Sequence, residues 1–210
     1  SQDHKARDNG DEGPNTGGMG AYSPAPIVSK TIFENVMHTV IRATVDAMAS
    51  EGMPYTGFLY AGLMIDENNK VKVLEYNCRF GDPETQPIMM RLKSNLALLC
   101  IAATQGKLDE VAVEWDERAC LGVVMAANGY PEKYTKGEKI ELPNDSTNTK
   151  IFHAGTKLSN NNIYSNGGRV LCATALGKDI QQAQIKAYKF LEKVDWPGAY
   201  YRTDIGFKAI

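Results

Sequence analysis

Apolar side chains recur at helical spacing in the segment that begins at Thr31. The apolar positions, three and four residues apart, are Ile32, Phe33, Val36, Met37, Val40, Ile41, Val45 and Met48. Because a helix brings residues with this spacing onto one face, the pattern predicts an amphipathic helix that packs in the core. Thr31 and Glu34 form a capping box for its start, and Gly52 is suited to end it.

Two apolar runs follow, at 56–65 and 71–77, separated by a polar turn. They predict a β-hairpin of two largely buried strands. In a strand alternate side chains share a face, so we expect Val71 and Val73 to point to the same side as Glu75 and Asn77.

The next segment has the pattern of a helix start. Asp82 is a suitable N-cap and Pro83 a suitable first helical residue. Apolar residues at helical spacing then continue to Gly106, so the pattern predicts one helix over 82–106.

The second half of the chain is predicted to be mostly β-structure. Strands are expected at 119–126, 139–142, 150–154 and 169–176, with a hairpin turn at 166–168 before the last one. A helix is expected from Asp179 to about Val194, with Asp179 and Gln182 as its capping pair. Residues 1–29 have no apolar period and predict a long irregular loop. We therefore predict an α/β (α+β) protein with domains at 1–107 and 108–210.

Composition narrows the class of protein. The chain has 210 residues and a formal net charge of -2, with 23 basic and 25 acidic residues, so no global field favours nucleic acid or a membrane surface as a partner. The four cysteines have neither CxxC nor zinc-ligand spacing and indicate reduced thiols in a cytoplasmic protein. No membrane span or signal peptide is predicted. The start at Ser1, without a methionine, suggests a piece of a longer protein.

A carboxylate and an amide lie two residues apart near the end of the strand predicted at 71–77. The side chains of Glu75 and Asn77 would emerge side by side, and their oxygens suit a hard divalent cation such as Mg²⁺. Arg79 and the turn at Asp82 follow, and the amides at a helix start favour anions. The alternative is a solvated face of an edge strand, which is the usual meaning of such a pair on its own.

Four glycines fall within eight residues in the segment GPNTGGMG, residues 13–20. Glycines let backbone amides approach an anion closely, so the segment predicts a substrate loop, with a flexible linker as the alternative. Lys5 lies just before the loop and could meet phosphate oxygens, but on its own the charged segment around it is more typical of a solvated stretch. For Arg169 the favoured prediction is an exposed strand residue that follows a turn. The alternative is a residue of a lid that contacts ligand.

Six segments together resemble the phosphoribosylamine-glycine ligases, an ATP-grasp family of purine biosynthesis. They are DHKARDNGDEGPNTGGMGAYSPAP, LYAGLM, LEYNCRFGDPETQPIMMRLKS, HAGT, SNGGRVLCATALG and PGAYYRTDIG. The likeness spans nearly the whole chain in the family's order. One departure is Ala6, where the family often has an arginine, which puts a basic contact there in doubt.

The resemblance implies ligation of glycine to 5-phosphoribosylamine with ATP, giving glycinamide ribonucleotide, ADP and phosphate through glycyl phosphate. It implies Mg²⁺ or Mn²⁺ at Glu75 and Asn77, with Arg79 and Asp82 as catalytic residues. The implied substrate-binding residues are Lys5, Asn15, Thr16, Gly17, Gly18, Met19, Gly20 and Arg169. The fold implied is the C-terminal part of an ATP-grasp domain followed by a small, mostly β C-terminal domain.

The family's N-terminal domain and first ATP-grasp portion have no counterpart in this sequence, so we expect the isolated chain to be inactive. One rival interpretation is another ATP-grasp ligase, such as a biotin-carboxylase-like enzyme. Another is a non-catalytic module that binds a phosphate ligand through the glycine loop and Arg169. A third is a structural fragment without any ligand.

Overall fold

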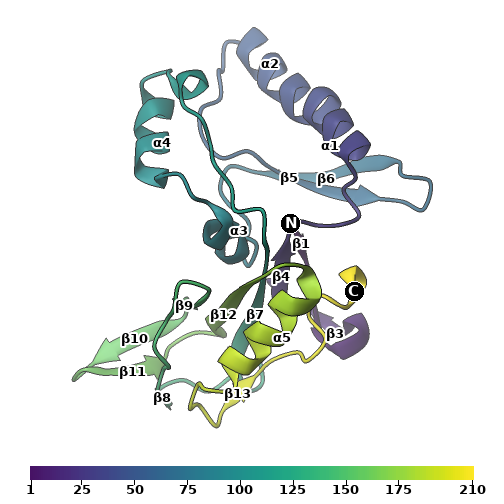
Figure 1. Cartoon of the computed structure of the whole chain (residues 1–210). Coiled ribbons are helices and arrows are strands. Elements are labelled where there is room, and N and C mark those ends of the chain that lie inside the picture. The colour runs from purple at the N-terminus through teal and green to yellow at the C-terminus, as the bar shows by residue number, and fades with distance from the viewer. The chain divides into compact units, whose positions relative to one another are not determined.

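The computed structural model describes residues 1–210 and divides them into two compact units. Unit 1 consists of Ser1–Pro24, Asp82–Arg91 and Asp116–Ile210, and unit 2 of Ala25–Gly81 and Leu92–Trp115, so the chain passes between units four times (Figure 1). Both contain helices and antiparallel strands, which confirms the predicted α/β (α+β) class. The predicted boundary between two sequence domains at 107/108 stays a prediction.

Unit 1 is built on a six-stranded antiparallel sheet in the order β1-β4-β7-β12-β9, with β13 also paired to β7. The strands are β1 (Gln2–Asp3), β4 (Gly20–Ser23), β7 (Ala119–Ala127), β9 (Thr149–His153), β12 (Arg169–Gly177) and β13 (Ala199–Tyr200). The long apolar strands β7 and β12 are almost wholly buried. They confirm the strands predicted at 119–126 and 169–176.

Helices cover both faces of this sheet. Gly122 of β7 faces Pro87 of α3 (Thr85–Arg91), while the neighbouring Leu121 packs near Gly206 and Ile180, the first residue of α5 (Ile180–Leu191). Because neighbouring strand residues point to opposite faces, α3 and α5 lie on opposite sides. The predicted cap of α5 is confirmed, since the Asp179 side chain accepts a hydrogen bond from the Gln182 amide at 2.7 Å.

Two small sheets complete unit 1. They are formed by β2 (Ala6–Asp8) with β3 (Glu12–Asn15), and by β10 (Thr156–Ser159), β11 (Asn162–Ser165) and β8 (Lys139–Ile140). Short 3-10 helices occupy Asn9–Asp11 and Phe207–Ala209. The prediction of an irregular loop over 1–29 is wrong, because four strands lie there that are too short to show an apolar period.

The hairpin predicted at 166–168 is also wrong. β11 pairs with β10 and β8, whereas β12 pairs with β7 and β9, so this turn joins two different sheets. The hairpin turn lies at Asn160 and Asn161, with φ of 48° and 60°. Asparagine tolerates this left-handed region better than most residues, which suits a tight turn.

The helix predicted from Thr31 opens unit 2. It runs as α1 (Lys30–Val36), a π-helical segment (Met37–Arg42) and α2 (Ala43–Ser50). Ser29 rather than Thr31 caps its start, because its hydroxyl accepts a hydrogen bond from the Ile32 amide at 3.2 Å. Gly52 ends it with a φ of 78°, as predicted.

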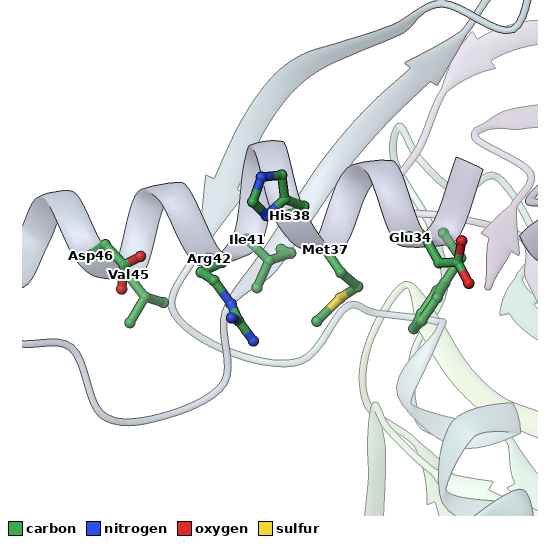
Figure 2. Close-up of a pocket in the computed structure, with 8 residues that line it drawn as sticks. Glu34, Met37, His38, Ile41, Arg42, Val45 and Asp46 are labelled. Carbon is green, nitrogen blue, oxygen red and sulfur yellow. The ribbon is translucent and has the colours of Figure 1, made fainter. Parts of the chain in front are cut away.

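Much of the apolar stripe of this helix is exposed, so the predicted core position is wrong. Met37, Ile41 and Val45 line a pocket whose lining residues all come from this helix (Figure 2), and Phe33 is 56% exposed. Within α1 only Ile32 and Val36 are buried. Unit 2 contains too few elements to cover a stripe of this width.

The predicted hairpin is present as β5 (Tyr60–Ile65) and β6 (Val71–Asn77), but its strands are not buried. Leu74 is 63% exposed, and neither strand has a buried residue. The sheet of unit 2 has only these two strands. A two-stranded sheet without a covering layer leaves apolar residues in water.

The single helix predicted over 82–106 is divided into α3 and α4 (Leu96–Thr104). The intervening residues pair with a distant segment, since the Lys93 amide donates to the Glu114 carbonyl at 3.0 Å. Asn95 then caps α4 by accepting from the Ala97 amide at 2.9 Å. A 3-10 turn follows at Leu108–Glu110.

Arg91 ties together the places where the chain leaves and re-enters unit 1. Its guanidinium donates to the Ser23 hydroxyl at 2.8 Å and to the carbonyls of Asp116 and Arg118 at 3.2 and 2.8 Å. The Asp116 amide returns a bond to the Arg91 carbonyl at 2.7 Å. Three of the four crossings are thus anchored on one side chain.

The four cysteines are free, as predicted.

No helix of the chain has the length and apolar content that crossing a membrane requires.

Candidate functional site

The predicted site residues fall into two groups that belong to different units. Glu75, Asn77 and Arg79 lie in unit 2 and are called the β6 patch. Lys5, the loop Asn15–Gly20, Asp82 and Arg169 lie in unit 1 and are called the loop patch. Each is described by itself.

The oxygen-bearing side chains of the β6 patch lie side by side, as predicted. Asn77 Nδ2 donates to Glu75 Oε1 at 3.2 Å. Opposite Glu75 stands Gly62, and a Cβ on that glycine would lie 2.9 Å from the Glu75 Cγ. The absence of a side chain at Gly62 therefore makes room for the Glu75 side chain.

Val71 and Val73 do not share the face of Glu75, which corrects the predicted alternation. Gly62 pairs with Glu75, but the next residue, Leu63, pairs with Val73, so β6 carries one extra residue. Paired residues point to the same side and neighbours to opposite sides. A β-bulge therefore turns Glu75 to the face opposite Val73.

Arg79 does not continue the strand, because β6 ends at Asn77. Its guanidinium is exposed and donates to the Phe80 carbonyl at 2.9 Å. The other guanidinium N–H groups have no partner among the residues of the chain, so they remain available to an anion.

The oxygen pair fits a magnesium-type ion better than a closed metal cage. No cluster of three or more His, Cys, Asp or Glu side chains in residues 1–210 could hold an ion. A carboxylate and an amide supply two oxygens, and Mg²⁺ commonly takes one or two protein ligands and completes its shell with water and phosphate oxygens.

The amides of the glycine loop are not free to cradle an anion. The Thr16 amide donates to the Lys5 carbonyl at 2.8 Å, and the Met19 amide to the His4 carbonyl at 2.8 Å. The Gly17 amide donates to the Tyr130 hydroxyl at 3.1 Å, and the Gly18 amide to the Thr16 hydroxyl at 2.9 Å. The predicted resemblance to a phosphate-binding nest is therefore not supported.

Close packing explains why these positions are glycines. A Cβ on Gly17 would lie 2.7 Å from the Arg169 Cζ, and one on Gly18, whose φ is 114°, would clash with the Pro83 ring. A Cβ on Gly20 would lie 2.7 Å from the Gly122 carbonyl oxygen. Glycine is needed here for approach and for the left-handed region.

Arg169 is the centre of the loop patch. From the sequence we favoured an exposed strand residue at this position over a residue that contacts ligand. It donates to the Gly17 carbonyl at 2.7 Å and the Gly18 carbonyl at 3.3 Å. It also donates to the Asp82 carbonyl at 3.2 Å and to Asp82 Oδ2 at 2.8 Å. The arginine side chain is 20% exposed and that of Asp82 is 56% exposed. One partly buried cation thus holds the loop together with Asp82, whose carboxylate faces solvent.

The other predicted substrate residues differ in how far a ligand could reach them. Met19 is fully buried, and Gly20 is buried in β4. The Lys5 ammonium pairs with Asp3 at 2.6 Å, and its side chain is half exposed. Asn15 is exposed, and none of its side-chain atoms bonds to the chain. Asp82 itself lies in a turn before α3, so it is not the N-cap that we predicted.

A buried polar network behind the loop was missed by the sequence reasoning. Arg202 is fully buried and donates to Asp204 at 2.8 Å through two nitrogens, to Asp11 at 2.8 Å and to the Ala6 carbonyl at 3.0 Å. His4, also buried, accepts from the Gly206 amide through Nε2 at 2.9 Å. The network ties the segment before the loop to the C-terminal tail.

The network sets the charge of its members. Burial lowers the pKa of His4 and outweighs the hydrogen bond with Asp11, which by itself raises it. Burial alone would raise the pKa of Asp11, but hydrogen bonds from Lys208, Arg202 and His4 hold it well below its ordinary value. His4 is therefore neutral and Asp11 charged at neutral pH. The only sequence signal was charged residues in both terminal segments.

Comparisons with known proteins bear on both patches. The phosphoribosylglycinamide synthetase ATP-grasp (A) domain model matches residues 1–85, and the C domain model of the same family matches residues 120–208. A phosphoribosylamine-glycine ligase of Vibrio cholerae is 58% identical over 212 aligned residues, which cover 100% of this chain and 49% of the relative. The chain spans about half the length of the curated relatives it matches.

Solved structures agree with these matches. The crystal structure of a phosphoribosylamine-glycine ligase from Thermotoga maritima has a TM-score of 0.87 and 36% identity, covering 97% of this chain and 50% of that one. A biotin carboxylase from Campylobacter jejuni has a TM-score of 0.63 at 12% identity, covering 88% and 40%, which shows a shared fold alone. The two domain models together match most of the chain, and the chain belongs to the phosphoribosylglycinamide synthetase family.

Proposed function

We propose that this chain is part of an enzyme that ligates glycine to 5-phosphoribosylamine with ATP. The products would be glycinamide ribonucleotide, ADP and phosphate, formed through glycyl phosphate in purine biosynthesis. The observation that carries the proposal is the 58% identity to a ligase of this name along the whole chain, both patches included. The predicted cytoplasmic location belongs to the same proposal.

The β6 patch would serve the phosphoryl transfer. Glu75 and Asn77 would hold Mg²⁺ or Mn²⁺, which when bound neutralises charge on the ATP phosphates. The exposed guanidinium of Arg79 would bind the oxygens of the transferring phosphoryl group, because several of its N–H groups are unused.

The loop patch would orient glycine and the amine of 5-phosphoribosylamine. Arg169 occupies only the Oδ2 atom of Asp82, and no group of the chain bonds to Oδ1. This oxygen can accept a hydrogen bond from a substrate amine and hold it in line for attack. Within the glycine loop, the free Asn15 side chain would contact the substrate. The rest of the loop would act by keeping its conformation, and it consists of Thr16, Gly17, Gly18, Met19 and Gly20. Lys5 would attract the substrate phosphate.

The active protein would be longer than this chain. We propose that N-terminal domains of the same protein supply the adenine pocket and the remaining phosphate contacts. The half-length match to the curated relatives and the exposed apolar side chains of unit 2 support this. The 210-residue chain alone would then bind substrates weakly and show no turnover.

The test is ADP release by the longer protein with ATP, Mg²⁺, glycine and 5-phosphoribosylamine. Turnover that needs both glycine and 5-phosphoribosylamine, and that Glu75→Ala abolishes, would support the proposal. Glu67→Ala is the matched control, because Glu67 is an exposed residue in the turn of the same hairpin. Ligand binding without ADP release in a well-folded wild type would instead indicate a non-catalytic binding module.

A further inference from the structure

Tyr130 reaches the glycine loop from a turn just beyond β7. Its hydroxyl accepts the hydrogen bond of the Gly17 amide at 3.1 Å, although 113 residues separate the two positions. Its ring packs against the backbone of Gly168, where any Cβ would clash with it. Tyr130 therefore contacts both the loop and the residue that precedes Arg169.

The backbone at Gly17 is consequently held from two sides. Its N–H donates to Tyr130, and its carbonyl accepts from Arg169 Nη1 at 2.7 Å. The missing side chain leaves room for the guanidinium, since a Cβ on Gly17 would lie 2.7 Å from the Arg169 Cζ. These two partners fix the orientation of the loop between the free Asn15 side chain and the turn that carries Asp82.

We propose that Tyr130 is a positioning residue of the substrate site and that it acts through Gly17. The proposal rests on the proposed ligase function. With Arg169 it keeps the loop in the conformation that binds 5-phosphoribosylamine, and it does not touch the reacting atoms. Its hydroxyl and its ring have separate tasks, because the ring packs on Gly168 and the hydroxyl alone bonds to the loop.

This separation permits a clean substitution. Tyr130→Phe keeps the ring and its packing and removes only the bond to Gly17. The matched control is Tyr134→Phe, since Tyr134 is a neighbouring, similarly half-buried tyrosine whose hydroxyl bonds to no residue of the chain.

The first readout needs no catalysis. In the 210-residue chain, amide hydrogen exchange at Gly17 should become at least about fivefold faster in Tyr130→Phe and stay unchanged in Tyr134→Phe, as loss of one neutral hydrogen bond implies. Unchanged exchange in Tyr130→Phe would overturn the proposal, since the bond would then not restrain the loop.

The second readout uses the longer ligase. The KM for 5-phosphoribosylamine should rise about fivefold, and kcat should stay within about twofold of the wild-type value. The reason is that a smaller fraction of the enzyme molecules would have the loop in its binding-competent conformation. A wild-type KM, or a loss confined to kcat, would overturn the positioning role. If the wild type itself shows no ligation, the proposed function fails, whereas normal wild-type turnover with a normal Tyr130→Phe enzyme refutes only this inference.

Discussion

The sheets of the two units differ in how far their apolar residues are buried. In unit 1, β7 and β12 are covered by helices on both faces and are almost wholly buried. In unit 2, β5 and β6 have comparable apolar content, but neither has a buried residue. An apolar sequence therefore specifies a strand without specifying that anything covers it. Covering elements come from elsewhere in the chain, and unit 2 has few.

The same contrast applies to the two patches. The loop patch is over-determined, because every amide from Thr16 to Met19 has an acceptor within unit 1. The β6 patch has one internal hydrogen bond between its two oxygen-bearing side chains. The loop patch is thus ordered by the chain itself, whereas the oxygen pair of the β6 patch is open, as the proposed cation site requires.

The largest expected effect tests the contrast in burial directly. Leu121→Ala in β7 should destabilise the chain by about 2–5 kcal/mol, because Leu121 is fully buried and its removal leaves a cavity. Leu74→Ala in β6 should change stability by no more than about 0.5 kcal/mol, because Leu74 is mostly exposed. Urea unfolding followed by circular dichroism measures both. Equal losses would mean that β6 is covered in solution and would remove the contrast.

Acid should act on unit 1 through the network behind the loop. His4 has a lowered pKa, so its contribution to stability is complete above its unfolded pKa of about 6.5 and is lost as the pH falls through its lower folded value. Asp11 and Asp204 also have lowered pKa values, which add loss in the same direction at still lower pH.

The measurement for this effect compares unfolding midpoints at pH 7.5 and pH 5.5. The wild type should be less stable at the lower pH, and His4→Gln should lose part of that dependence because no group titrates at the position. His153→Gln serves as the control, since His153 is exposed. Identical pH dependence in the wild type and His4→Gln would show that His4 is not the group responsible.

How much the sequence predicts depends on how local the cause is. The strands β7 and β12 and the Asp179 cap follow from neighbouring residues, and their predictions are confirmed. The break before Asn95 was not predictable from local spacing, because pairing with Glu114 causes it. β2 and β3 are too short to show a period.

The candidate sites divide in the same way. The adjacency of Glu75 and Asn77 follows from strand geometry alone, and the 3.2 Å hydrogen bond between their side chains confirms it. The central role of Arg169 does not, because its partners Gly17 and Asp82 are 152 and 87 residues away. Likewise nothing near Tyr130 in the sequence indicates that its hydroxyl bonds to Gly17. Long-range contacts of this kind need the folded chain.

The smallest expected effect concerns the space that Gly62 leaves for Glu75. Gly62→Ala would place a methyl group 2.9 Å from the Glu75 Cγ and displace the carboxylate. Stability should change by less than about 1 kcal/mol, because no residue of β5 is buried. In the longer protein, the Mg²⁺ concentration for half-maximal ADP release should rise about tenfold, since Glu75, the proposed metal ligand, loses its position. Ala61→Ser is the control, because Ala61 pairs with Tyr76 on the opposite face. An unchanged Mg²⁺ requirement in Gly62→Ala would mean that the position of Glu75 on β6 does not set metal affinity, and the β6 patch would lose its proposed role.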